Sequence, residues 1–185
     1  MTRPDLPAEL TKAARASTLL HFKHLLGLGV PRETVASLRL DSWGWGVENA
    51  VDVGDGLYRP GDGPLHLVLP VWDNEDLVDL VAFRSGSPAD WKLRTGLGLA
   101  LGLDRGWERH HWQDEVELSL TPLDWLRTGA DGLCIVDWDA PEIAMLASLP
   151  RIVCPTRESA SQLRQALTRP QPLPPIFVKE YRDAA

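Results

Sequence analysis

Three aspartates, Asp124, Asp137 and Asp139, have the residue type and spacing that could support a metal-dependent reaction in this chain. They lie within residues 116–139, VELSLTPLDWLRTGADGLCIVDWD, which predict a strand, a short helix beginning at Pro122, a Gly-Ala-Asp turn and a second strand. In open α/β sheets, ligands usually bind at the carboxyl ends of such strands. Alternation along the second strand places Asp137 and Asp139 on one face, near enough to share a cation with Asp124.

Two interpretations of these aspartates follow. In the first they hold Mg²⁺, an ion that prefers oxygen ligands, and the chain is a Mg-dependent nuclease or nucleotidyl-transfer enzyme. In the second they are structural: Asp139 is a helix N-cap, and Asp124 takes the acid position of a capping box that begins at Thr121. Asp137 is then a solvated strand end. Because capping contributes about 1 kcal/mol per residue and accounts for two of the three, we favour the second interpretation, with no cofactor and no metal.

The elements that must position these residues fall into two parts. Residues 1–106 predict an α+β part, and residues 107–185 predict a part in which strands and helices alternate. The elements expected in the first part are helices over 7–27 and 31–40, a loop with a β-hairpin over 42–63, an antiparallel hairpin of strands 66–72 and 77–83, and a strand over 91–96. This part therefore combines two helices with antiparallel hairpins.

The second part has a βαβ period. Its expected elements are strands over 116–120, 133–138, 151–154 and 176–181 and helices over 122–128, 139–149 and 156–167. Connections of this length imply parallel strands joined by right-handed crossovers. The predicted fold class is thus α/β, with a mostly parallel, Rossmann-like sheet in the C-terminal half. The two parts form either separate domains or one compact unit.

The charge of the chain limits its partners. The net charge is −7, and residues 41–150 carry seven Lys/Arg against twenty Asp/Glu. A polyanion would be repelled by this middle region and attracted, if at all, by the two ends. The apolar stretches are shorter than the ~20 residues of a membrane span. No basic-then-apolar leader opens the chain, so a cytoplasmic protein without a membrane partner is expected.

The order of motifs carries a family resemblance over roughly residues 25–180. Two N-terminal helices with a Gly-Val-Pro turn are followed by LVLPVWDNEDLVDLVAF, then WKLRTG, then LTPLDWLRTGADGLCIVDW. This order resembles the primase-like Toprim proteins of bacterial phages, prophages and plasmids. The resemblance implies a Toprim-like sheet in the C-terminal half. It also implies an ancestry in which carboxylates hold Mg²⁺ for phosphoryl transfer.

The chain departs from the family at the acids. The family's Glu at the end of the first Toprim strand aligns with Leu120, and the Gly that follows it aligns with Thr121. The family's Asp-x-Asp aligns with Pro-Thr-Arg at 155–157. The resemblance therefore implies a catalytically degenerate protein rather than an enzyme. Such a protein would be an accessory or DNA-binding factor in phage or mobile-element replication, with nucleic acid and replication proteins such as a helicase as partners.

Two sets of residues could make these contacts. The candidate nucleic-acid contacts are basic: Arg84, Lys92, Arg94, Arg127 and Arg157. The candidate protein contacts are four of the eight tryptophans: Trp43, Trp45, Trp107 and Trp112. Aromatic residues are enriched at interface centres, so exposure of these tryptophans would favour a non-enzymatic protein-interaction module instead.

Overall fold

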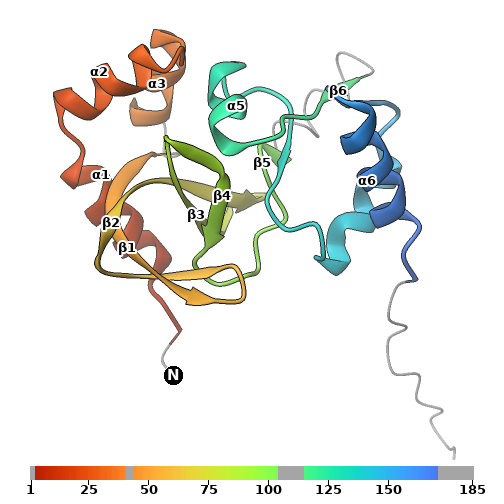
Figure 1. Cartoon of the computed structure of the whole chain (residues 1–185), viewed down its shortest axis with the longest axis horizontal. Coiled ribbons are helices and arrows are strands. Elements are labelled where there is room, and N and C mark those ends of the chain that lie inside the picture. Colours follow the sequence, from red (N-terminus) through yellow and green to blue (C-terminus); the bar gives the residue numbers. More distant parts are fainter. Residues whose placement is uncertain (1–2, 41–43, 104–114, 171–185) are drawn as a thin grey trace, which may run out of the picture.

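An antiparallel sheet of four strands dominates the first half of the protein. A computed structural model describes residues 3–40, 44–103 and 115–170 (Figure 1). The strands, in the order in which they pair, are β1 (Gly46–Gly54), β2 (Leu57–Asp73), β3 (Asp76–Arg84) and β4 (Ser87–Leu93). The expected hairpin of 66–72 and 77–83 is confirmed as β2 and β3, with Asn74 of its turn at a positive φ of 52°.

The sheet curls because β2 is long and irregular. Its 17 residues pair with β1 and β3, and Leu57 at its beginning also pairs in parallel with Leu93 of β4. The register with β1 jumps between Asn49, opposite Leu65, and Ala50, opposite Pro60. Four residues of β2 therefore bulge out, and we call residues 61–64 the β2 bulge.

Three helices precede this sheet, not two. They are α1 (Leu6–Ala16), α2 (Leu19–Gly27) and α3 (Arg32–Leu40). The single helix expected over 7–27 is interrupted at Ser17 and Thr18. Thr18 has an extended backbone, and its N–H donates to Nδ1 of His21 at 3.1 Å. A side chain that satisfies the first N–H groups begins a new helix there, so this prediction was wrong.

The centre of β2 and β3 is buried on both faces. Leu67 and Leu69 of β2 and Phe83 of β3 belong to a core shared with α2, α3 and the C-terminal half. Val68 and Ala82, between them in the strands, belong to a core under α1. Burial on both faces explains why these strands are continuous apolar runs rather than alternating ones.

The described residues of the C-terminal half form short strands and three helical segments. They are β5 (Ala100–Leu101), β6 (Val116–Glu117), α5 (Pro122–Arg127), β7 (Cys134–Ile135), the 3-10 helix η1 (Pro141–Ser148), β8 (Ile152–Val153) and α6 (Arg157–Leu167). β6 pairs with β8 in parallel, Leu118 and Leu133 form a parallel bridge, and β5 pairs with β7 antiparallel. Parallel pairing in the described C-terminal half is confined to these short contacts, so the expected mostly parallel sheet is not confirmed there. The strand expected over 176–181 lies outside the described residues.

Helix caps decide how the predicted helices begin. α5 begins as expected after Thr121, whose hydroxyl oxygen accepts the N–H of Asp124 at 3.1 Å, and α6 begins as expected after Thr156. The helix expected over 139–149 is instead η1, with Ala140 as its N-cap and no side-chain cap. The assignment of Asp139 as a helix N-cap is therefore wrong.

The two halves of the chain share a core. Val47 and Phe83 from the sheet belong to the same buried cluster as Leu123 and Trp125 of α5. Among the described residues, no helix has the length and apolar character needed to cross a membrane. The described molecule is a mixed α/β structure with helices, a curled antiparallel sheet and a smaller C-terminal layer beside it (Figure 1).

Candidate functional site

Asp124 is engaged in holding the start of α5. The Thr121 hydroxyl donates to its Oδ2 at 2.7 Å, and Arg127 lies 3.2 Å from its Oδ1. Both carboxylate oxygens therefore have partners from the same helical segment. The Thr121 hydroxyl also accepts the Asp124 N–H as the N-cap, so the carboxylate serves the start of the helix and is in a structural position.

Asp137 and Asp139 lie together at a different place. With Asp55, they line a cavity of about 490 Å³ between the β1–β2 turn and the end of β4. Oδ1 of Asp137 accepts the N–H of Asp139 at 2.9 Å, and Asp139 pairs with Arg169 at 2.6 Å. Within the described part of the chain, no three or more His, Cys, Asp and Glu side chains are grouped to hold a metal ion. The structure thus does not assemble Asp124, Asp137 and Asp139 into a cage for Mg²⁺.

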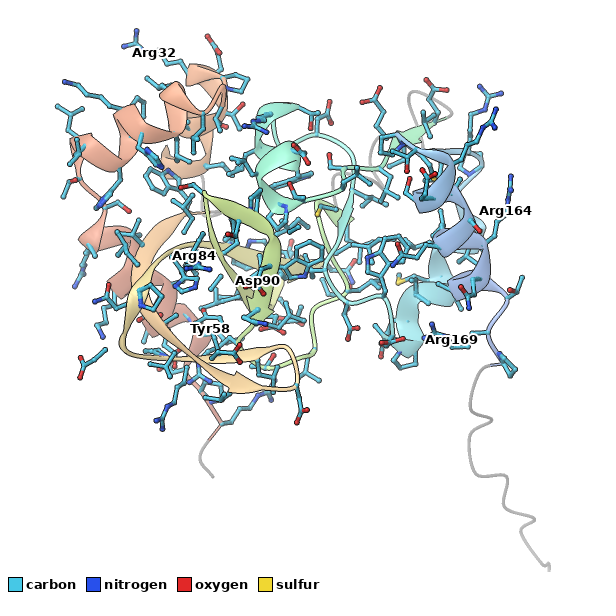
Figure 2. All side chains as sticks on the ribbon, viewed as in Figure 1. Arg32, Tyr58, Arg84, Asp90, Arg164 and Arg169 are labelled. Carbon is cyan, nitrogen blue, oxygen red and sulfur yellow. The ribbon has the colours of Figure 1, made fainter. Side chains whose placement is uncertain are left out.

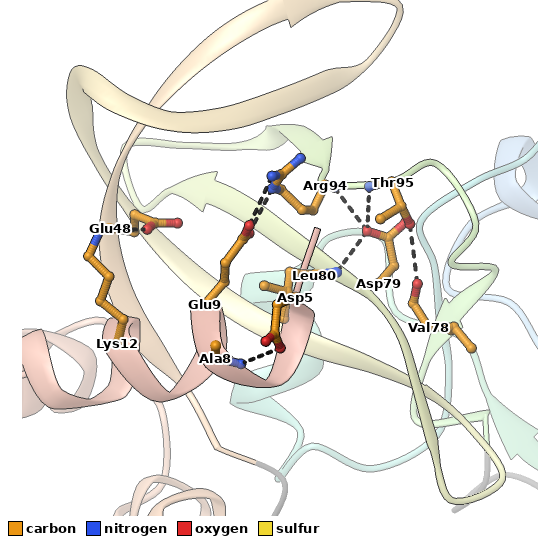
Figure 3. Close-up of polar contacts among 10 residues, drawn as sticks. All are labelled: Asp5, Ala8, Glu9, Lys12, Glu48, Val78, Asp79, Leu80, Arg94 and Thr95. Atoms are coloured by element: carbon orange, nitrogen blue, oxygen red, sulfur yellow. Dashed lines mark hydrogen bonds and ion pairs between the residues drawn. The ribbon is translucent and has the colours of Figure 1, made fainter. Parts of the chain in front are cut away.

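Two of the five basic candidates hold the fold together. Arg94 binds Glu9 of α1 through two bonds, Nε to Oε2 at 2.7 Å and Nη2 to Oε1 at 2.9 Å, and this bond raises the pKa of Arg94 (Figure 3). Arg127 donates to the carbonyl of Leu28 at 2.8 Å besides its pairing with Asp124. Both guanidinium groups are therefore committed to other parts of this chain.

The remaining candidates are more available. Lys92 lies 3.1 Å from Asp90 and 3.3 Å from Asp52. The bond with Asp90 raises the pKa of Lys92, so it stays protonated while its charge is balanced locally. Arg84 and Arg157 are exposed and have no ion pair or side-chain hydrogen bond with any described residue.

Arg84 and Lys92 come together at one cavity, which we call the sheet pocket. Its volume is about 400 Å³, and the polar side chains around it are Asp52, Tyr58, His66, Arg84, Asp90 and Lys92. Lys92 lies opposite Ala82, so it points to the face of the sheet on which α1 packs. Figure 2 shows Arg84, Asp90 and Tyr58 around this region.

The protonation states in the sheet pocket follow from its hydrogen bonds. Nδ1 of His66 is 2.7 Å from the carbonyl oxygen of Pro64, and a carbonyl can only accept, so Nδ1 carries the proton. A neutral His66 therefore presents Nε2 as an acceptor. Burial raises the pKa of Tyr58, so its hydroxyl remains protonated. The N–H of Gly54 and the Lys92 ammonium lower the pKa of Asp52.

A second polar group, beside α1, was not anticipated from the sequence. Glu48 of β1 has a side chain only 7% exposed, and Lys12 of α1 is 4.0 Å away (Figure 3). Neither Glu48 oxygen has a hydrogen-bond partner among the described residues, and burial raises the pKa of this carboxyl. Its signal in the sequence is weak: one Glu within the strand GVENAV.

Asp79 of β3 was also missed. It is fully buried, and its carboxylate accepts backbone N–H groups at 2.7–3.0 Å from Leu80, Arg94, Thr95, Leu97 and Gly98. These bonds fix the segment after β4 against the first half of β3 (Figure 3). In the sequence, Asp79 stands out as an acid inside the apolar run LVDLVAF. In the structure, the role of its carboxylate is structural.

The tryptophan candidates do not form an exposed patch in the described structure. Trp45 is 5% exposed and packs in the core between the sheet and α2–α3, so the expectation of an exposed side chain is wrong for it. Trp45 directly precedes β1, and with Val47, two residues further on, it belongs to that core. Trp43, Trp107 and Trp112 lie outside the described residues.

The chain was also compared with known proteins. Protein-family models, curated proteins and solved structures were searched, and none of the three comparisons found a match. The function proposed below therefore rests on the sequence and on the geometry of the described residues.

Proposed function

We propose that this chain is a catalytically degenerate, Toprim-like accessory protein that binds nucleic acid during the replication of a phage or another mobile element. The observation that carries the proposal is the sheet pocket. There the exposed guanidinium of Arg84 has no ion-pair partner among the described residues and lies beside Lys92 and His66. We assign to Arg84 a contact with one backbone phosphate, for which its planar fork of donors is suited.

The order of the C-terminal elements supports the Toprim-like part of the proposal. A strand, α5, a second strand, η1, a third strand and α6 follow one another, as the family resemblance implies. Leu120, at the position of the family's catalytic Glu, is 44% exposed before α5. An exposed apolar side chain there supplies no oxygen ligand, which supports a binding protein rather than a phosphoryl-transfer enzyme.

The charge of the pocket sets the expected strength of binding. Asp52 and Asp90 together outweigh the charge of Lys92, and Arg84 brings the formal charge of the pocket to zero. Few phosphates can then be neutralised, and the net charge of −7 opposes approach of a polyanion. Weak binding that is detectable at low salt is therefore expected, with a partner such as a helicase supplying further affinity.

The proposal is tested by fluorescence anisotropy with labelled single-stranded and duplex DNA at low salt. Arg84→Ala should weaken binding and reduce the salt slope of log K by about 0.7 for single strands or about 0.9 for duplex DNA. Arg32→Ala is the matched control, since Arg32 is an exposed arginine at the start of α3, far from Arg84 in Figure 2. Absence of binding to both DNA forms at low salt, or equal losses in the two variants, would contradict the proposal.

A further inference from the structure

A second cavity lies between the first two helices and the sheet. It has a volume of about 540 Å³, within the usual range of small-ligand sites. Its polar side chains are Lys12, His21, Glu48, Asn49 and Asp62, and we call it the helix pocket. α1 and α2 form one wall, and β1 with the β2 bulge forms the other.

Glu48 is the unusual group in this pocket. Its side chain is more than nine-tenths buried, and its two oxygens accept no hydrogen bond from any described residue. The Lys12 ammonium, at 4.0 Å, is beyond hydrogen-bond distance, and the Lys12 side chain is 78% exposed. A buried carboxylate without donors is costly, so this position favours a donor that carries positive charge.

The rest of the pocket agrees with a cationic ligand. Asp62 adds a second carboxylate, while Ala16, Pro60 and Leu65 supply apolar surface. His21 accepts the Thr18 N–H at Nδ1, so its neutral form carries a proton at Nε2 and adds no charge. Two carboxylates against one lysine exclude an anion as the preferred ligand, in contrast to the phosphate assigned to the sheet pocket.

We infer that the helix pocket binds an organic cation, a primary ammonium or guanidinium group on a short aliphatic stem. The cationic head hydrogen-bonds the Glu48 carboxylate, and the stem lies against the apolar wall. Lys12 moves aside to admit the head, which is feasible because its own contact with Glu48 is long and its side chain is largely in solvent. The cation is either a free small molecule or a Lys or Arg side chain of a protein partner.

The first experiment is isothermal titration calorimetry of the full chain with n-butylamine and n-butylguanidine, with n-butanol as the uncharged control. Saturable binding of the cations and none of the alcohol is expected. Glu48→Gln should weaken binding by about tenfold or more, because the charged partner of the ligand is lost. Glu33→Gln, which changes an exposed carboxylate on α3, should bind like the wild type.

Lys12→Met provides a test with the opposite sign. Removing the competing ammonium while keeping a side chain of similar length should strengthen binding of both cations severalfold, whereas a merely structural role for Glu48 predicts no gain. This variant keeps the inference testable even if Glu48→Gln does not fold. The inference is overturned if neither the wild type nor Lys12→Met shows saturable binding of the cations. It is also overturned if a folded Glu48→Gln variant binds them as tightly as the wild type does.

The source of the cation is distinguished by short peptides. Gly-Lys-Gly and Gly-Arg-Gly with blocked termini present the same head groups on a peptide backbone. If only the peptides bind, or if they bind much more tightly than n-butylamine and n-butylguanidine do, the natural ligand is a side chain of a protein partner. If only the free cations bind, the natural ligand is a small molecule. Both outcomes support the site. The result is independent of nucleic-acid binding, because Arg84→Ala should leave it unchanged.

Discussion

At the scale of single residues, the described structure contains acids that are buried for different reasons. Asp79 has five backbone donors, whereas Glu48 has none among the described residues. The first carboxylate stabilises the fold in its ionised form. The second is an ionisable group whose charged form burial disfavours. Substitutions at the two positions should therefore act in opposite directions at neutral pH.

Asp79→Asn should destabilise the protein by about 3 kcal/mol or more, because an amide NH₂ would face backbone N–H donors in a buried site. Urea unfolding measures the loss. With the amide oxygen in the place of Oδ1, amide hydrogen exchange should be faster at Leu97 and Gly98, whose N–H groups lose their acceptor Oδ2. Asp76→Asn, an exposed change in the β2–β3 turn, is the control and should leave both measurements near the wild-type values.

Glu48→Gln should raise the free energy of unfolding at pH 7 relative to the wild type by about 1–2 kcal/mol, because burying a neutral amide costs less than burying an ionised carboxylate. The pKa of Glu48 is raised in the folded protein above its ordinary value of 4.5. The stabilisation that protonation provides is therefore complete below pH 4.5 and is lost as pH rises through the folded pKa.

The advantage of the Glu48→Gln variant should accordingly shrink as the pH is lowered toward 4. Urea unfolding of the two proteins at several pH values checks this. If the variant is less stable than the wild type at pH 7, or if the difference in stability does not depend on pH, then the ionised Glu48 carboxylate has stabilising partners in the folded protein.

At the scale of secondary-structure elements, the docking of α1 on β1 depends on a close approach at Gly46. A Cβ atom at this position would lie 2.3 Å from the carbonyl carbon of Ala13 and 2.6 Å from its Cβ. The backbone of α1 rather than a flexible side chain blocks the space. α1 therefore reaches the sheet only because β1 has a glycine there.

Gly46→Ala should destabilise the protein by about 1–3 kcal/mol, the typical effect of forcing an extra carbon into a packed contact. A lower melting temperature is expected in thermal unfolding followed by circular dichroism. Gly27→Ala at the end of α2 is the matched control, since nothing lies within 4 Å of its added Cβ. If both variants melt like the wild type, α1 is not packed against β1 as described.

At the scale of the whole molecule, the sheet and α5 share one core cluster. Trp45 from the first half and Trp125 from the second are both buried in it, and the Trp91 indole also donates to the carbonyl of Val136 at 2.9 Å. Since the same buried contacts belong to both halves, neither half should lose its packing without the other.

Urea unfolding should therefore be a single transition, with the same midpoint by tryptophan fluorescence and by far-UV circular dichroism. Fluorescence reports mainly on packing around the tryptophans, and circular dichroism reports on the helices of both halves. Two separated midpoints would instead indicate two domains, with a boundary near the division at residues 106 and 107 expected from the sequence.

Local signals explain what could be predicted about this protein from its sequence. The hairpin of β2 and β3 and the beginnings of α5 and α6 depend on a turn at 73–76 and on caps by Thr121 and Thr156. Each signal acts within about four residues, so it can be read along the chain. The same reasoning missed the break at Thr18, where a cap interrupts an otherwise continuous helical pattern.

Only the tertiary structure decided which polar side chains meet. Arg94 reaches Glu9 across 85 positions, and Asp79 reaches Gly98 across 19. The curl of β2 brings Tyr58 and His66 to the pocket of Arg84 and Lys92, and the packing of α1 buries Glu48. Burial and pairing of charges depend on which elements pack together, and that is a property of the assembled fold rather than of neighbouring residues.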